Sequence, residues 1–354
     1  MNKIDARAKS ITDLLSNKKY TVDYYQREYK WQTRQIRELL EDLEANFLDS
    51  YEEGHPRSEV EKYKHYFLGS IIVSHRDGKN FIIDGQQRLT SITLLLIYLH
   101  NRQRDRAQNE KVDISILIFS EKFGKKSFNL DIDERAVCLE ALYNQYERSF
   151  DVNNASESIH NILARYDDIE QHFPATLANG ALPYFIDWLK ENVDLVEITT
   201  SSDEDAYTIF ETMNDRGLSL SPTDMLKGYL LANITDTHER AKANDLWKEQ
   251  MLQLTRLGKE EDADFFKAWF RAKYAQSIRE RKKESLKQDF EIIGTPFHEW
   301  IHDNSRQIGL TTAEDFRDFV LRHMQYFSSH YMRIRQAAHT LTPGMEYIFY
   351  NAQN

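Results

Sequence analysis

The sequence has few of the residues and patterns that mark specialised protein classes. Cys138 is the single cysteine, which excludes an internal disulfide and suits a reducing cytoplasm. No run approaches the about 20 apolar residues of a membrane span, and the longest, 92–99, contains a threonine. The opening MNKIDARAKS is not followed by the apolar core of a signal peptide. We therefore predict a cytoplasmic protein without membrane segments.

The chain also lacks an excess of positive charge. With 57 acidic residues against 46 lysines and arginines, its formal net charge is -11. A protein that coats nucleic acid by charge alone is usually basic, so DNA would have to bind at a local basic face or with the help of another domain. The most basic stretch, RAKYAQSIRERKKESLK (271–287), is more typical of a solvated helix face than of a DNA contact surface.

What is present indicates an α+β protein with a helical C-terminal half. The 354 residues are enough for two or more domains and a large core. Hydrophobic spacing predicts a helix over 33–48 with Thr33 as its N-cap. Strands are predicted at HYFLGSIIVSH and KNFIIDG, joined by an Asp-Gly turn, and at 194–200. The segment of about 131–191 and everything beyond 236 are predicted to be helical.

The stretch FIIDGQQRLTSITLLL (81–96) joins a buried strand end to a long helix. One interpretation is a helix cap, in which Asp84 is the N-cap and Gln87, three residues later, closes a capping box. Two residues stay unexplained by this cap. Gly85 costs helix stability, and Arg88 places a cation in a first turn, where the helix dipole disfavours it.

The alternative interpretation is a phosphate site. A glycine lets the backbone approach a phosphate closely, and the free N–H groups that follow it would point at the anion. The guanidinium of Arg88 could fork onto the phosphate oxygens. Asp84, beside that phosphate, would hold a metal ion or orient a water. From pattern alone, the cap and the phosphate site both remain open.

Four motifs, in order along the chain, resemble the DUF262 family, the N-terminal domain of GmrSD-type restriction enzymes and of SspE-like phosphorothioate-sensing defence proteins. They are YQREYKW (25–31), HYFLGSIIV (65–73), IDGQQRLT (83–90) and FETMNDRGLSLSPTDMLKGYLL (210–231). The resemblance covers about residues 1–235, which we predict to be the family domain, with 131–191 as a helical insertion. It implies a small ParB/sulfiredoxin-like mixed sheet with helices.

The resemblance also implies a function. We expect an NTP-binding and NTP-hydrolysing sensor domain of an anti-phage, DNA-modification-dependent restriction protein, which uses GTP or ATP with Mg²⁺. The alternative is a switch module that binds a nucleotide or a DNA phosphate without turnover. The expected partners are the nucleotide, DNA that carries a phosphorothioate or a modified base, and a C-terminal DUF1524/HNH nuclease domain. We expect the helical region 236–354 to be truncated before that nuclease, because LTPGMEYIFYNAQN ends as a new apolar pattern starts. No HNH-type site is found here, so no nuclease activity is assigned.

Site residues follow from the resemblance, position by position. The catalytic set is Asp84, Gln86, Gln87 and Arg88, with Asp84 also holding the metal. The nucleotide-binding set is Tyr25, Gln26, Arg27, Gly85, Asn214 and Arg216. Purely structural roles are the alternative at several positions. In that interpretation Tyr25 is a core aromatic residue, Asn214 belongs to a helix C-cap that ends at Gly217, and Lys227 is a surface lysine.

Two further patterns are better explained by packing than by chemistry. HEWIH (298–302) matches a zinc-protease motif, but Phe297, Trp300 and Ile301 form an ordinary helical stripe around it. No glycine and third histidine follow at the spacing of the extended motif. Cys138, inside RAVCLEALY, is predicted to be a core residue and not a nucleophile.

Overall fold

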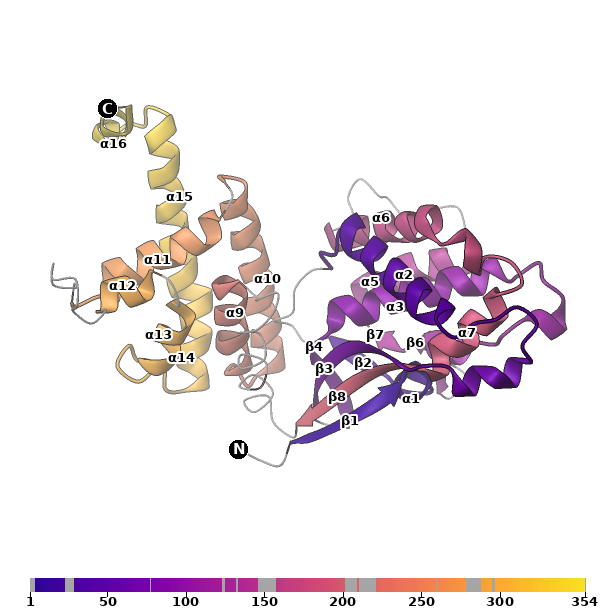
Figure 1. The fold of residues 1–354 in the computed structure, drawn as a ribbon. Helices are drawn as coiled ribbons and strands as arrows, with labels where there is room; N and C mark the ends of the chain where they lie inside the picture. Colours follow the sequence, from indigo (N-terminus) through magenta and orange to yellow (C-terminus); the bar gives the residue numbers. More distant parts are fainter. Residues whose placement is uncertain are drawn as a thin grey trace. The chain divides into compact units, whose positions relative to one another are not determined.

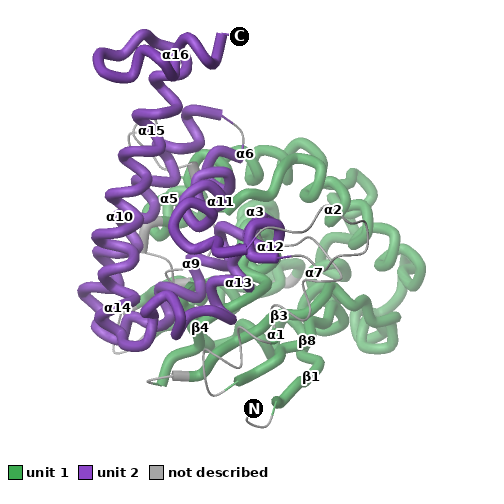
Figure 2. Tube along the Cα trace, turned by 90° about the vertical axis from the view of Figure 1, so that its left-hand side faces the viewer, with its two compact units in different colours: residues 1–212 green, residues 213–354 purple. Residues whose placement is uncertain are grey.

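The computed structural model forms two compact units, Met1–Thr212 and Met213–Asn354, coloured separately in Figure 2. The structure describes residues 4–22, 29–76, 78–122, 125–131, 133–145, 157–200, 209, 221–258, 260–277, 288–294 and 297–353. Within these ranges, no helix combines the length and apolar character needed to cross a bilayer. The predicted α+β class, with a mixed sheet followed by a mostly helical region, is confirmed. The likeness to ParB and sulfiredoxin stays a prediction.

The first unit is built on a six-stranded mixed sheet with the order β1-β8-β3-β4-β2-β7 (Figure 1). Its strands are β1 (Asp5–Ser10), β2 (Tyr20–Val22), β3 (Tyr66–Arg76), β4 (Lys79–Asp84), β7 (Leu130–Asp131) and β8 (Val193–Thr200). The predicted hairpin is confirmed as the antiparallel pair β3–β4, and the third predicted strand is β8. A separate two-stranded sheet contains β5 (Phe119–Lys122) and β6 (Lys125–Phe128).

Three neighbouring strands, β4, β2 and β7, run parallel and end at the same edge of the sheet. Thr21 of β2 lies opposite Phe81 of β4 on one side and Asp131 of β7 on the other. A helix begins just after two of these strands: α3 (Gln86–Arg102) follows β4, and α5 (Asp133–Asn144) follows β7. Ligands of open α/β sheets bind outside the carboxyl ends of parallel strands. This edge is therefore where a binding site is expected.

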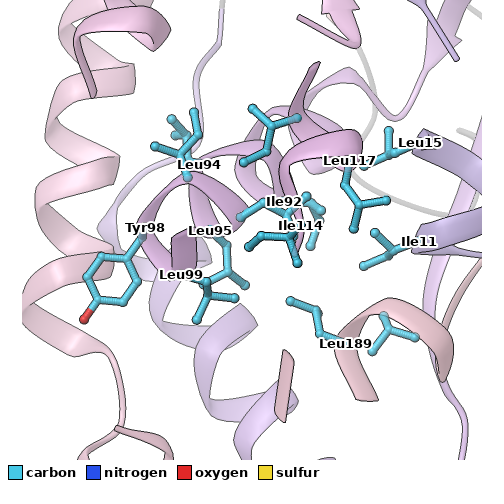
Figure 3. Close-up of a cluster of buried hydrophobic side chains, with 14 of the residues drawn as sticks. Ile11, Leu15, Ile92, Leu94, Leu95, Tyr98, Leu99, Ile114, Leu117 and Leu189 are labelled. Carbon is cyan, nitrogen blue, oxygen red and sulfur yellow. The ribbon is translucent and has the colours of Figure 1, made fainter. Parts of the chain in front are cut away.

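The larger helices of the first unit cover one face of the sheet (Figure 1), and side chains of α3 lie in the buried hydrophobic cluster of Figure 3. Besides α3 and α5 the unit contains α1 (Ile11–Leu15), α2 (Thr33–Leu48), α4 (Ser115–Ile118), α6 (Glu157–His172), α7 (Leu182–Glu191) and 3-10 turns at Arg57–Lys62, Gln108–Glu110 and Ala175–Leu177. Every α3 residue from Leu89 to Leu99 is buried. A helix that is enclosed all round is a core element rather than a surface helix.

The helix α2 has the predicted range but not the predicted cap. The N-cap is Gln32, whose N–H donates to Gln35 Oε1 at 2.9 Å, and Thr33 is the first helical residue. The Thr33 hydroxyl instead accepts a hydrogen bond from Arg165 Nη2 at 3.1 Å. The prediction of Thr33 as cap is wrong because a contact from a distant helix, α6, uses its oxygen.

The described part of the second unit is helical. It contains α9 (Pro222–Ala232), α10 (Thr237–Thr255), α11 (Glu261–Tyr274), α12 (Asp289–Ile293), α13 (Phe297–Asp303), α14 (Ala313–Asp318), a π-helical turn (Phe319–Met324), α15 (Gln325–His339) and α16 (Glu346–Gln353). Stacked aromatic rings form much of its core, among them Trp247, Phe266, Trp269 and Phe319. Helix α9 packs on α10, α11, α13 and α14. The two units are defined by contacts within the chain, whereas the predicted domain of 1–235 is the extent of a family resemblance. The boundary between the units does not test that extent, which stays a prediction.

Candidate phosphate site at the start of helix α3

The residue that caps α3 is Gly85. Asp84 is the last residue of β4, and Gly85 has a φ of +91° with no side-chain hydrogen bond at the cap. A Cβ at Gly85 would collide with the side chain of Ile71 on β3. Only glycine adopts this backbone conformation without strain, and only glycine fits here. The predicted cap at Asp84 is therefore wrong, because the left-handed turn moves the cap one residue further along the chain.

The Gln87 side chain anchors the segment that precedes α2. Its Oε1 accepts a hydrogen bond from the Lys30 backbone N–H at 2.8 Å. Beside this contact, the fully buried Tyr29 shares a hydrogen bond of 2.8 Å with Ser91, one turn further along α3. Burial raises the pKa of the Tyr29 phenol, so the ring stays neutral. The capping box proposed for Gln87 is absent from this described region, since its oxygen holds a neighbouring segment.

Helix α6 holds the same segment from the other side. Asn161 Nδ2 donates to the Tyr29 carbonyl at 2.8 Å, and Arg165 Nη1 donates to the Trp31 carbonyl at 2.9 Å. The end of the YQREYKW motif is therefore fixed between α3 and α6. Its first predicted site residues, Tyr25, Gln26 and Arg27, lie outside the described residues, and so do Asn214, Arg216 and Gly217.

The Arg88 side chain lies across β3. Its Nη1 donates to the Ser70 carbonyl at 2.6 Å. The guanidinium occupies the space that a side chain at Gly69 would need, since a Cβ there would lie 2.9 Å from Arg88 Cζ. Gly69 has a φ of +127° and follows a shift in the register between β3 and β8. Burial lowers the pKa of the Arg88 guanidinium, and the nearby Asp84 carboxylate opposes that shift.

The side-chain amide of Gln86 is buried at the start of α3. Its side chain is 4% exposed, and within the described residues its Nε2 has no hydrogen-bond partner. Buried amide groups are bonded in the great majority of cases, because an unmade hydrogen bond costs about 1–3 kcal/mol. Leu89 makes the first helical hydrogen bond, to the Gly85 carbonyl at 3.0 Å, so the N–H groups of 86–88 precede the helical ladder. The start of α3 thus presents several donors.

A second arginine, which no sequence motif indicated, lies on the flank of α3. Arg135, in the first turn of α5, is 4% exposed, and its Nη1 donates to Thr90 Oγ1 at 3.4 Å. Thr90 is one turn beyond Gln86 on the same side of α3. The first-turn anomaly noted for Arg88 does not mark Arg135 in the sequence, because Asp133 and Glu134 precede it in the same turn.

The carboxylate available at this helix start is Asp84. Among the residues described, no group of three or more His, Cys, Asp or Glu side chains could hold a metal ion. Mg²⁺ is commonly held by one or two carboxylates together with substrate phosphates, so a single aspartate fits an ion that arrives with a nucleotide. In HEWIH, His298 is buried, whereas His302 is exposed and packs its ring on Tyr229.

The remaining predicted residues divide between core and surface. Cys138 is buried, as predicted for a core residue. Lys227 is also buried, so its interpretation as a surface lysine is wrong. Of the basic segment 271–287, the described Arg271 stacks on the Phe290 ring with Cζ 4.2 Å from the ring centroid. Lys273 lies over the rings of two neighbouring aromatic residues, so both cations contribute to packing.

Comparison with known protein families identifies the family of this chain. No curated protein matches the chain. The family model of the GmrSD restriction endonuclease N-terminal domain matches residues 11–231, which is more than half of the chain and includes all four sequence motifs. The resemblance predicted from those motifs is thereby confirmed. The chain belongs to the family of GmrSD restriction endonuclease N-terminal domains, which indicates a restriction-type defence protein.

Proposed function

We propose that this chain binds and hydrolyses a nucleoside triphosphate at the start of α3, and that hydrolysis gates a DNA-directed restriction response. The observation that carries the proposal is the buried Gln86 amide, whose Nε2 has no partner in the described residues, in the same helical turn as Arg88. A phosphate there would accept hydrogen bonds from Gln86 Nε2 and from the backbone N–H groups that precede the helical ladder. It would also relieve the cost of a half-buried cation in a first turn.

The structure changes the roles proposed for the two glutamines. Gln87 Oε1 already accepts a hydrogen bond from Lys30, so we assign Gln87 to positioning. Gln86 is the better candidate to orient the attacking water or a phosphate oxygen. Arg88 supplies positive charge to the phosphates. Asp84 would hold Mg²⁺ together with the phosphates of GTP or ATP, and this ion would neutralise developing charge.

Tyr25, Gln26 and Arg27 remain in the proposed site on the family resemblance, and the contacts of the described residues on either side of them support this. Val22, before them, pairs with Ile82 near the end of β4, and Tyr29, after them, bonds to Ser91. Asn214 and Arg216 remain in it on the family resemblance alone. The proposed partner of the whole protein is DNA carrying a phosphorothioate or a modified base, read together with a nuclease domain.

A second candidate is a phosphate-binding switch without turnover. It is favoured by the small number of candidate catalytic groups in the described site, where the Asp84 carboxylate acts on Arg88 by charge and Gln87 Oε1 accepts a hydrogen bond from Lys30. In this case a nucleotide or a DNA phosphate would bind and alter the partner domain without being cleaved.

One experiment separates the two candidates. Phosphate release and nucleotide binding are measured on wild type, Asp84→Asn and Arg88→Ala, with Arg102→Ala as the control. Arg102 is an exposed arginine at the other end of the same helix, so its loss tests only the removal of charge. We expect Arg88→Ala to lose binding and Asp84→Asn to bind without releasing phosphate. Tight binding without release by wild type favours the switch. Normal release by both site variants would refute the assignment.

A further inference from the structure

We infer that Arg135 forms a second anion-binding arm of this site, so that its preferred ligand is a chain of two or three linked phosphates rather than a single phosphate. The inference rests on the proposed function, since it concerns the same helix start. It adds a residue from outside every sequence motif and names the feature of the ligand that this residue recognises.

The first argument is topological. Strands β4 and β7 flank β2, and all three end at one edge, so α3 and α5 begin side by side. Packed helices lie about 8–10 Å apart. The bond from Arg135 in the first turn of α5 to Thr90 in the second turn of α3 confirms that the two helix starts are neighbours. Two sets of N-terminal N–H donors therefore serve the same edge.

The second argument is the arrangement of side chains around α3. With about 100° between successive residues, Gln86 and Thr90 lie on one side of the helix and Arg88 on the opposite side. Arg88 reaches Gly69 and Ser70 of β3. Arg135 reaches the side of Thr90. The two cations therefore flank the start of α3 from opposite directions, with the Gln86 amide on the Arg135 side.

The third argument is size. A helix with its side chains is about 10–12 Å wide. A single phosphate at the helix axis can accept hydrogen bonds from the backbone and from one flanking guanidinium. A diphosphate or triphosphate extends across the first turn and can meet Arg88 at one end and Arg135 with Gln86 at the other. Arg88 lies in a first turn without an acid, which is unfavourable for α3 alone and suits such a ligand, whereas Arg135 shares the first turn of α5 with Asp133 and Glu134.

The test compares phosphate chain length. Binding of inorganic phosphate, pyrophosphate and tripolyphosphate to the full chain is measured by calorimetry at constant ionic strength. For wild type we expect the affinity to rise at least about tenfold from phosphate to tripolyphosphate, because the longer anion can accept a further charged hydrogen bond from Arg135. Arg135→Gln should keep phosphate binding and lose this rise, whereas Arg88→Ala should weaken all three ligands.

Controls separate binding from packing. Thr90→Val removes the hydrogen bond between Arg135 and Thr90 but keeps the charge of Arg135, so the preference for long phosphate chains should persist. If Arg135→Gln does not fold, Arg135→Lys should lose tripolyphosphate affinity while keeping phosphate affinity. An unchanged chain-length preference in a folded Arg135 variant overturns the inference, and so does equal wild-type affinity for all three anions. Failure of wild type to bind any of them overturns the proposed function itself.

Discussion

Helices α9 and α3 both begin inside family motifs, yet they begin in opposite ways. At α9, the Ser221 hydroxyl accepts a hydrogen bond from the Asp224 N–H at 3.2 Å, and Pro222 occupies the first helical position. At α3, the cap is a left-handed glycine without a side-chain hydrogen bond, and the first turn contains Arg88 and no acid.

The difference shows that α9 stabilises its first turn with its own side chains, whereas α3 does not. A side-chain cap contributes about 1 kcal/mol and a well-placed acid about 0.3–1 kcal/mol, so α9 gains what α3 forgoes. Helix α3 is compensated by its enclosure in the core. A helix start that is buried, uncapped and cationic is suited to binding an anion, and a capped, acidic one is suited to stability.

Of the substitutions that test this comparison, Gly85→Ala should have the largest effect on stability. The left-handed φ and the collision with Ile71 should lower the free energy of unfolding by roughly 3 kcal/mol or more. Denaturant unfolding measures this change. Gly180→Ala is the matched control, because Gly180 has open space around its Cα and should change stability by less than about 0.5 kcal/mol. Equal changes in stability at the two glycines would show that the turn at Gly85 does not require a glycine.

Substitutions of the adjacent Gln86 and Gln87 should change the free energy of unfolding in opposite directions. Gln86→Leu replaces an amide that lacks a partner in the described residues, so it should raise the free energy of unfolding by about 1 kcal/mol and abolish nucleotide binding. Gln87→Leu removes the acceptor of the Lys30 N–H and should lower stability by about 1 kcal/mol. Thermal unfolding with and without nucleotide distinguishes the two. A destabilised Gln86→Leu would mean that this amide is satisfied in the free protein.

Ser221→Ala tests the capped start of α9, the other helix of the comparison. Loss of the cap hydrogen bond at α9 should lower stability by about 1 kcal/mol. Because this helix start is proposed to serve stability alone, the nucleotide affinity should match that of wild type in an equilibrium titration. A loss of affinity without a loss of stability would reverse the roles assigned to the two helix starts.

A smaller effect is expected from pH at a third helix start, that of α14. Hydrogen bonds from Thr312 and Thr311 lower the pKa of Asp315 to about 2. Between this value and the ordinary aspartate value the unfolded chain binds more protons, so stability falls as pH falls through that interval. Urea midpoints at pH 4 and pH 2 should therefore differ less in Asp315→Asn than in wild type. An equal loss in both proteins would contradict the assignment of this proton linkage to Asp315.

Local pattern was enough for the α+β class, the β3–β4 hairpin and the range of α2, because these depend on residues a few positions apart. It also found Gly85 and Arg88 as anomalies. The physical reasons for them were out of reach, since Ile71 and Gly69 meet this turn only after β3 has packed beside it. Arg135 was missed for the same reason: strand order, not sequence distance, brings it to α3.

The enclosure of α3 has a consequence for any signal that begins at its first turn. A helix buried on all sides cannot rotate or slide without displacing the core around it, so its response to a bound ligand is small. Motion must then be carried by segments tethered to that turn, and the bond from Lys30 to Gln87 is such a tether. Strengthening or releasing it would change the freedom of residues 29–31 while the helix itself stays still.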